Sequence, residues 1–277
     1  MLDPVALRTF LTVIQTGGFS AAARRLDVGQ STVSGHVARL EKQVGRTLLR
    51  RDTHSVELTA DGTVMAGFAR SILDECERAM SYFADDGISG RVRFGVSEDL
   101  VATKTPEILR TFRADHPRVD IELTIGLSED LHTSLRAGSL DLVLAKRNPG
   151  QRHGQLIFTE PLVWAGAPDT VLRPGDPIPL VTFPEPSISR TAALSALADA
   201  GLDHRITCVS NNQQGLRAAV LAGLGVMVHA RRLLPADVVE LDGLPDPGLT
   251  EVVVITRGRP ATRAEAALLA VLRAATW

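Results

Sequence analysis

The stretch FSAAARRLDVGQSTVSGHVARLEKQVGRTLLRR, residues 19–51, decides the fold of the N-terminal part of the chain. It predicts a short alanine-rich helix over Ala21–Leu26, which Ser20 caps, then a turn at residues 27–29 and a longer helix over Gln30–Val44. The longer helix places its inward-facing apolar side chains at spacings of three and four: Val33, Val37 and Leu40. A short helix, a tight turn and a longer helix are typical of a helix-turn-helix.

The same stretch is strongly basic. From Ser20 to Arg51 it holds seven basic and two acidic residues, a net charge of +5, whereas the whole chain has 30 basic and 32 acidic residues. Small polar side chains at the start of the longer helix could bond to base edges and phosphates without blocking entry to a groove: Gln30, Ser31, Thr32 and Ser34. This pattern predicts a DNA-binding surface, with a solvated helix face as the alternative for Arg24, Arg25 and Arg39.

The flanking segments complete a small domain over residues 1–58. Upstream, Asp3–Thr16 predicts a helix whose apolar face is formed by Leu7, Phe10, Leu11 and Ile14. Downstream, apolar and polar residues alternate enough over Thr47–Leu58 to predict a two-stranded wing with residues 52–55 at its tip. We therefore expect a winged helix-turn-helix.

A long helix is predicted over residues 59–84. Its apolar residues recur at spacings of three and four, and those expected to mediate dimerisation are Met65, Phe68, Ile72, Ala79 and Phe83. A helix of this length projects beyond a small domain, so its stripe needs a partner, most simply the same helix of a second copy. Two-fold symmetry predicts a DNA operator with an inverted repeat, its half-sites about one helical turn apart.

Beyond a hinge at residues 85–90, strand-like runs alternate with helical stretches over residues 91–277. The strand-like runs are Val92–Val96, Val119–Ile125, Asp141–Ala145, Leu162–Ala165, Leu180–Phe183, Arg205–Val209, Val226–His229 and Val252–Thr256. The helical stretches are Lys104–Asp115, Glu129–Ala137, Thr191–Ala200, Gln213–Leu221 and Ala264–Ala274. This order is typical of an α/β fold.

Composition and motifs exclude several other classes of protein. The longest apolar run, Ala218–Val228, is too short to span a bilayer, and no signal peptide is visible, so we expect a cytoplasmic protein without membrane contact. Cys76 and Cys208 lie far apart in the sequence, which argues against a disulfide framework, a zinc site or a redox sensor.

Enzyme motifs are missing as well. The seven histidines form no HExxH, no GxSxG occurs, and Gly223-Leu224-Gly225 lacks the rest of a dinucleotide fingerprint. We predict no catalytic residue, no metal and no cofactor. A solute-binding protein and a nucleoid-type binder without a ligand are the remaining alternatives to a protein that binds a specific DNA operator.

Residues 19–51, followed by VELTADG at residues 56–62, resemble the DNA-binding module of LysR-type transcriptional regulators. The matching positions, in register, are Phe19, Ala21–Ala23, Leu26, Val28, Gln30-Ser31, Val33-Ser34, Leu40-Glu41, Gly45, Leu48, Arg51, Leu58-Thr59 and Gly62. Looser landmarks of the family's effector-binding domain follow: VRFGVS, HPRVDIEL, LRAGSLDLVLA and AAVLAGLGV. The chain departs from the family pattern at Gly29, where a capping serine is usual, at Gly35, often basic, and at Leu49, frequently phenylalanine.

The resemblance implies roles for residues of the first domain. The recognition helix would lie in the major groove of double-stranded DNA, and the wing would reach the neighbouring backbone or the minor groove. The implied DNA-binding residues are Gln30, Ser31, Thr32, Ser34, His36, Arg39, Arg50, Arg51 and His54. It also implies a homodimer or homotetramer, and contact with RNA polymerase if the protein is an activator.

For the second domain the resemblance implies a two-lobed, periplasmic-binding-protein-like fold that binds an unidentified small-molecule effector in its cleft. The first lobe would span about residues 91–161 plus 252–277, and the second about 162–251. The implied effector-binding residues are Ser97, Leu127, Ser128, Lys146, Ser187, Ser189, Arg190 and Asn211.

Some of these residues have a second interpretation. Ser97 and Ser128 could be helix caps instead of ligand contacts, and Glu98 and Asp99 suit a first helical turn. If the two acids face the cleft, they disfavour an anion on that wall, while Arg190 would favour one opposite.

Overall fold

A computed structural model describes residues 1–51, 56–83, 87–101, 103–148, 150–258 and 261–277. Within it the chain divides into two compact units, residues 1–87 and most of residues 88–277. The predicted wing tip with His54 lies outside the described residues, as do residues 84–86 of the predicted long helix and hinge.

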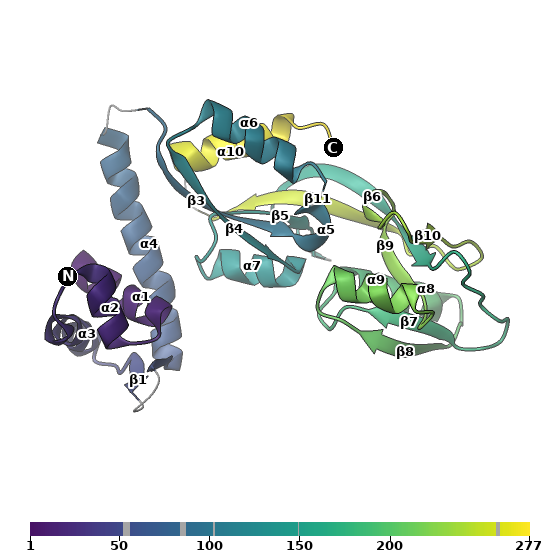
Figure 1. Cartoon of the computed structure of the whole chain (residues 1–277), viewed down its shortest axis with the longest axis horizontal. Coiled ribbons are helices and arrows are strands. Elements are labelled where there is room, and N and C mark those ends of the chain that lie inside the picture. The colour runs from purple at the N-terminus through teal and green to yellow at the C-terminus, as the bar shows by residue number, and fades with distance from the viewer. Residues whose placement is uncertain (52–55, 84–86, 102, 149, 259–260) are drawn as a thin grey trace. The chain divides into compact units, whose positions relative to one another are not determined.

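Three helices form the core of the first unit (Figure 1): α1 (Pro4–Thr16), α2 (Phe19–Leu26) and α3 (Gln30–Val44). The Asp3 carboxylate caps α1 by accepting a hydrogen bond from Val5 N at 2.9 Å. The predicted cap at Ser20 is wrong, because α2 begins at Phe19 with Gly18 as its N-cap. The backbone bond from Ala22 N to Gly18 O already places Ser20 inside the first turn.

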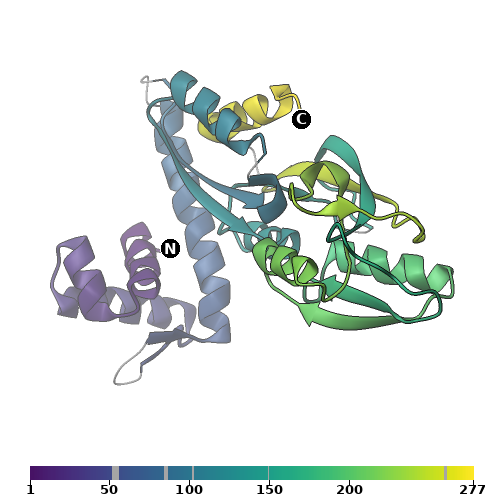
Figure 2. The ribbon, with the colours of Figure 1, turned by 45° about the vertical axis from the view of Figure 1, so that its right-hand side comes forward.

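The wing and a long helix complete this unit, and Figure 2 shows them side by side. Strands β1 (Leu49–Arg51) and β2 (Val56–Leu58) pair antiparallel, with Leu49 opposite Leu58. Helix α4 (Ala60–Phe83) follows. Its buried side chains, Ala66, Ala69 and Leu73, join the core of the three helices.

The second unit is built on a seven-stranded sheet of order β10-β6-β11-β5-β3-β4, with β9 also paired to β6. Its strands are β3 (Gly90–Ser97), β4 (Val119–Gly126), β5 (Leu142–Lys146), β6 (Gln155–Gly166), β9 (Met227–Ala230), β10 (Val239–Glu240) and β11 (Leu249–Thr256). β3 lies parallel to β4 and β5, whereas β11 is antiparallel to β5 and β6. Helices α6 (Thr105–Asp115) and α10 (Arg263–Ala274) cover one face, and α7 (Ser128–Arg136) covers the other (Figure 1).

A second lobe of this unit surrounds a two-stranded parallel sheet of β7 (Ile178–Thr182) and β8 (His204–Val209). Helices α8 (Ile188–Asp199) and α9 (Gln213–Leu221) pack beside it (Figure 1). The long strand β6 belongs to both lobes, because it pairs with β11 in its first part and with β9 further on. One apolar core runs through both lobes, with Phe94 and Leu144 in the first and Trp164 and Leu180 near the second.

Some short elements were not predicted from the pattern of apolar residues. They are α5 (Glu98–Val101), the 3-10 turn Arg231–Leu233 and β10. Among the described residues, no helix is both long enough and apolar enough to cross a membrane.

Candidate functional site

Most of the residues predicted to read DNA lie on the open side of α3. Gln30, Ser31 and Thr32 are exposed, while Ser34 and His36 are half-buried. Two of the predicted residues also make contacts within the domain. His36 Nδ1 lies 3.0 Å from Thr9 Oγ1, and Arg39 Nη2 lies 3.3 Å from the Asp3 carboxylate, so both fix α3 against α1.

A ridge on α3 faces directly away from the core. It consists of Ser31, Gly35, Ala38 and Lys42, all exposed and spaced by three or four residues. A methyl group added at Gly35 would meet no atom within 4 Å. Because its side chains are small up to the terminal lysine, this ridge lets the helix backbone approach a groove closely.

The wing is tied to α3 through a carboxylate that the sequence alone did not reveal as an anchor. Glu41 Oε1 accepts hydrogen bonds from Leu48 N at 2.7 Å and Leu49 N at 3.2 Å. Arg50 is exposed on β1 opposite Glu57. The side chain of Arg51 lies outside the described part of the chain.

The predicted dimerisation stripe is divided in the structure. Met65 and Ile72 are half-buried and pack against the helical core of their own domain. Phe68 is 61% exposed and Ala79 is exposed, whereas the side chain of Phe83 is not among those described. Val64, which the sequence reading omitted, is 60% exposed beside Phe68.

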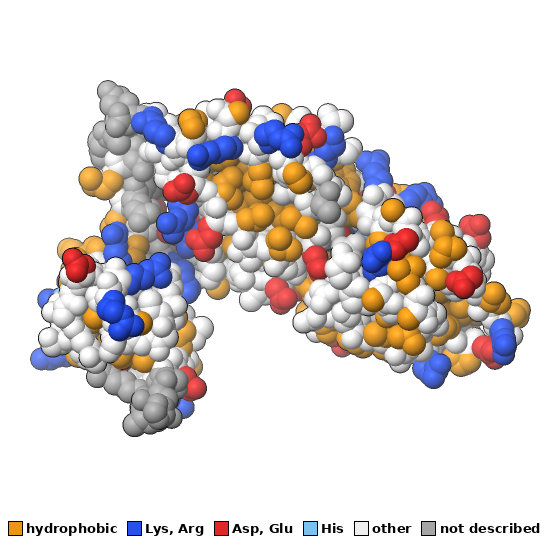
Figure 3. All heavy atoms as spheres, viewed as in Figure 1, with side chains coloured by type: hydrophobic (Ala, Val, Ile, Leu, Met, Phe, Trp, Pro, Cys, Tyr) orange, Lys and Arg blue, Asp and Glu red, His pale blue; other side chains and the backbone are white. Residues whose placement is uncertain are grey.

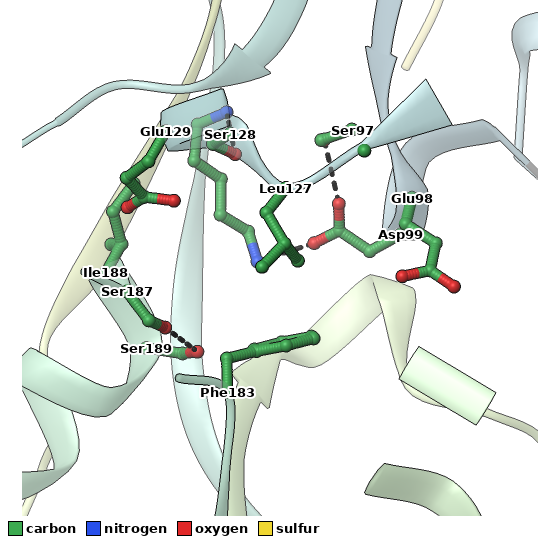
Figure 4. Close-up of a pocket in the computed structure, with 12 residues that line it drawn as sticks. Ser97, Glu98, Asp99, Leu127, Ser128, Glu129, Phe183, Ser187, Ile188 and Ser189 are labelled. Carbon is green, nitrogen blue, oxygen red and sulfur yellow. Dashed lines mark hydrogen bonds and ion pairs between the residues drawn. The ribbon is translucent and has the colours of Figure 1, made fainter. Parts of the chain in front are cut away.

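In the second unit, a small cavity of about 30 Å³ lies between the two lobes (Figure 4). The predicted effector residues that line it are Ser97, Leu127, Ser128, Lys146, Ser187 and Ser189. Residues that were not predicted also line it: Glu98, Asp99, Gly126, Glu129, Phe183 and Ile188. A volume of this size holds about one water molecule, so the cleft is nearly closed in this conformation.

A buried ion pair forms the first-lobe wall of the cavity. Lys146 Nζ lies 2.5 Å from Asp99 Oδ2, and Ser97 Oγ donates to Asp99 Oδ1 at 2.8 Å (Figure 4). Burial alone would raise the pKa of Asp99, but Lys146, the nearby His229 and these hydrogen bonds outweigh it and lower that pKa to about 2. Asp99 is therefore ionised and neutralises Lys146.

The two serines with alternative readings have different partners. Ser97 bonds to the Asp99 side chain, and Ser128 Oγ accepts from Lys146 N at 3.3 Å, so neither hydrogen bond caps a helix. His132 is buried beside them, with Nε2 2.9 Å from Lys146 O, and burial lowers its pKa.

The second-lobe wall presents the N-termini of α8 and α9, each with a side-chain cap. Ser187 Oγ accepts from Arg190 N and lies 3.3 Å from Ser189 Oγ, while Asn212 Oδ1 accepts from Gly215 N at 2.8 Å. Arg190 lines a smaller neighbouring cavity and pairs with Glu185 at 2.9 Å.

Asn211 is exposed, and its side chain bonds to that of Asn212. It is not among the residues that line either cavity.

Carboxylates of the first lobe reach both of these helix N-termini. Glu98 Oε2 accepts from Gln213 N, the first residue of α9, at 2.9 Å. Glu129 faces the backbone N–H of Ile188, the first residue of α8. Burial raises the pKa of Glu129, and the backbone N–H groups of Glu129 and Ile188 together with the charge of Lys146 only partly offset this effect. Helix N-termini favour negative charge, so each carboxylate lies where the second lobe offers backbone N–H groups to an anion.

Family models match both units of the chain. The bacterial regulatory helix-turn-helix of the lysR family matches residues 5–63, and the LysR substrate binding domain matches residues 85–277. The chain belongs to the LysR family of transcriptional regulators. This confirms the predicted α/β fold with a winged helix-turn-helix, and the predicted function of a DNA-binding regulator with an effector-binding domain.

Individual relatives agree with the family. The HTH-type transcriptional regulator PecT of Dickeya dadantii is 33% identical over 247 residues, which cover 88% of this chain and 78% of PecT. DgdR of Burkholderia cepacia is 31% identical over 239 residues, covering 86% of this chain and 81% of DgdR.

Solved structures of the family share the fold. ArgP from Mycobacterium tuberculosis superposes with a TM-score of 0.74 at 20% identity, covering 99% of this chain and 97% of ArgP. Full-length CbnR in complex with its target DNA superposes with a TM-score of 0.65 at 22% identity, covering 98% and 99% of the two chains.

Proposed function

We propose that this LysR-type regulator binds an inverted-repeat operator as a homodimer or homotetramer, with the exposed ridge of α3 in the major groove and the wing beside it. The observation that carries the proposal is the ridge Ser31, Gly35, Ala38 and Lys42. It lies in a stretch of net charge +5 and offers small side chains where a helix would meet base edges.

Exposed apolar surfaces support self-association. On α4, Val64 and Phe68 stand out from the domain. In the second unit, Figure 3 shows hydrophobic side chains gathered over β4, where Leu123 and Ile125 are exposed. Patches of contiguous exposed apolar side chains are sites of protein–protein contact more often than the rest of a protein surface is.

We further propose that a small-molecule effector binds in the cleft and alters operator binding. The cavity-lining residues Ser97, Leu127, Ser128, Lys146, Ser187 and Ser189 are the proposed contacts. Arg190 would join them only by leaving Glu185. The protein would act in the cytoplasm, where its operator lies, without catalysing a reaction and without a cofactor, and as an activator it would contact RNA polymerase.

A footprint of the purified protein on the intergenic region next to its own gene tests the DNA-binding proposal. We expect protection of an inverted repeat that persists at near-physiological salt. Lys42→Ala should weaken binding and reduce the salt slope by about 1, the value for one lost phosphate contact. Lys104→Ala, on the second unit, is the matched control and should change neither. Uniform protection that disappears as salt rises, with no preferred sequence, would contradict the proposal.

A further inference from the structure

The cleft of the second unit has its anion-binding positions occupied by the chain itself. The N-termini of α8 and α9 are the places where this lobe could best hold a negative ligand group. The first already faces the carboxylate of Glu129, and the second donates to Glu98 through Gln213 N at 2.9 Å. An anionic effector would have to displace these carboxylates and would then lie beside them.

The charges that line the cavity are unbalanced. Glu98, Asp99 and Glu129 carry three negative charges and Lys146 one positive charge, which leaves a net charge of −2. The ion pair of Asp99 with Lys146 at 2.5 Å cancels one of the acids. Arg190, on the neighbouring cavity, is matched by Glu185 and adds nothing to this sum. Glu98 and Glu129 are therefore the two acids of the cavity that form no ion pair with a described cation.

A buried hydroxyl beside the cleft also lacks a partner. Thr182 is 5% exposed, and its Oγ1 has no hydrogen-bond partner among the residues that the structure describes. It lines the smaller cavity, which shares Phe183 and Ser189 with the cleft. Buried polar groups in folded proteins are nearly always satisfied, so an unmet hydroxyl at this place points to a polar ligand group.

We propose that the effector carries a positively charged group, an ammonium or a guanidinium, which binds at the Glu129 carboxylate in the cleft. This inference rests on the proposed role of the cleft as the effector site. Figure 4 shows the Glu129 side chain directed into the space between the lobes, on the side opposite Phe183. A cation there would compensate a half-buried carboxylate without breaking the ion pair of Lys146 with Asp99.

A matched set of small molecules tests the sign of the charge. Pentylamine, 5-aminopentanoate, pentanoate and pentanol share a five-carbon chain and differ in charge. Binding to the full chain is measured by saturation-transfer NMR at constant ionic strength, with each compound titrated to about 20 mM, where millimolar affinities become visible. We expect saturable binding of pentylamine and 5-aminopentanoate, and none of pentanoate or pentanol.

Two variants assign the binding to Glu129. Glu129→Gln should weaken the amines by about tenfold or more, as expected for a lost charge-assisted hydrogen bond. Asp130→Asn removes the same charge one residue away, at an exposed position, and should leave their affinity within about twofold. Chemical denaturation of each variant shows whether it is folded.

Three results would overturn the inference: binding of pentanoate alone, no saturable binding of either amine to the wild-type chain, or equal losses in the two variants. None of them bears on operator binding, which the footprint measures without these compounds. A regulator that protects its operator and responds to an anionic effector would refute the charge assignment and leave the proposed function intact.

Discussion

Glu41→Ala should loosen the wing from the helix-turn-helix. The Glu41 carboxylate accepts hydrogen bonds from the backbone N–H groups of Leu48 and Leu49, at 2.7 and 3.2 Å. Both residues are buried, with exposures of 1% and 4%. Alanine leaves these two donors without their acceptor in a place that water reaches poorly.

The magnitude follows from the number and kind of bonds. A hydrogen bond to a charged group contributes about 1.5–3 kcal/mol, and a buried donor left unsatisfied costs about 1–3 kcal/mol. Since the longer bond is the weaker one and the wing can shift toward solvent, we expect a total loss of about 2–4 kcal/mol in the stability of the wing. That is a large share of the ~5–15 kcal/mol that stabilises a typical domain.

Hydrogen exchange measures this loss locally. The amides of Leu48 and Leu49 should exchange about 30- to 1000-fold faster in the variant, with weaker operator binding as a consequence. Glu57→Ala, an exposed acid on the same wing, is the control and should change exchange little. Unchanged protection of both amides in Glu41→Ala would refute the role assigned to this carboxylate.

Four further substitutions test the packing and the charges. Gly62→Ala should destabilise the first unit, because the new methyl group would collide with the backbone carbonyl of Leu48. Gly35→Ala, where the methyl group meets no atom, should stabilise α3 by up to about 1 kcal/mol. The midpoints of thermal unfolding should therefore move in opposite directions for these two variants. Asp99→Asn should cost about 2 kcal/mol at neutral pH. Because the folded-state pKa of Asp99 is depressed to about 2, the difference in free energy of unfolding between wild type and variant should vanish as pH falls from about 4 toward 2. Chemical denaturation at several pH values measures this difference, and a constant difference would contradict the expectation. Glu129→Gln should stabilise the unliganded protein at neutral pH, because the raised pKa of Glu129 means that its charged form destabilises the fold above that pKa. This gain in stability should disappear in acid, where the wild-type Glu129 is protonated, and Asp130→Asn should show no such gain.

Elements with a clear apolar period could be predicted from the sequence. Helix α9 spans Gln213–Leu221 as predicted, because its apolar face is continuous over that range. Strand β6 was underestimated: the prediction began at Leu162 and the strand begins at Gln155. Its first half pairs with β11 while several of its side chains stay exposed or half-buried, so backbone pairing without full burial leaves little trace in a hydrophobic pattern.

The site was predictable where it follows from strand ends, and not where it depends on distant partners. Ser97 and Lys146 line the cleft because each ends a strand of the sheet. Glu129 was missed, since its meeting with Ile188 joins segments remote in sequence. Arg190 was expected to attract an anion, but nothing in its local sequence shows that Glu185 holds it in the fold.

Charge is distributed unevenly along the first unit and is nearly balanced in the second. Residues 20–51 carry +5, residues 52–87 carry −6 with two basic and eight acidic residues, and residues 88–277 carry −1 with 20 basic and 21 acidic residues. Basic groups attract a phosphate backbone, so the excess of cations over residues 20–51 favours contact with DNA through α3 and the start of the wing, whereas the second unit carries too little net charge to attract DNA. Within that nearly neutral unit the acids of the cleft are a local feature, since Glu98, Asp99 and Glu129 line the cavity and Lys146 is the one cation among its described lining residues. The charge that would select the ligand is thus separate from the charge that would attract DNA, so reversing the charge of the cleft should change the ligand without changing the operator.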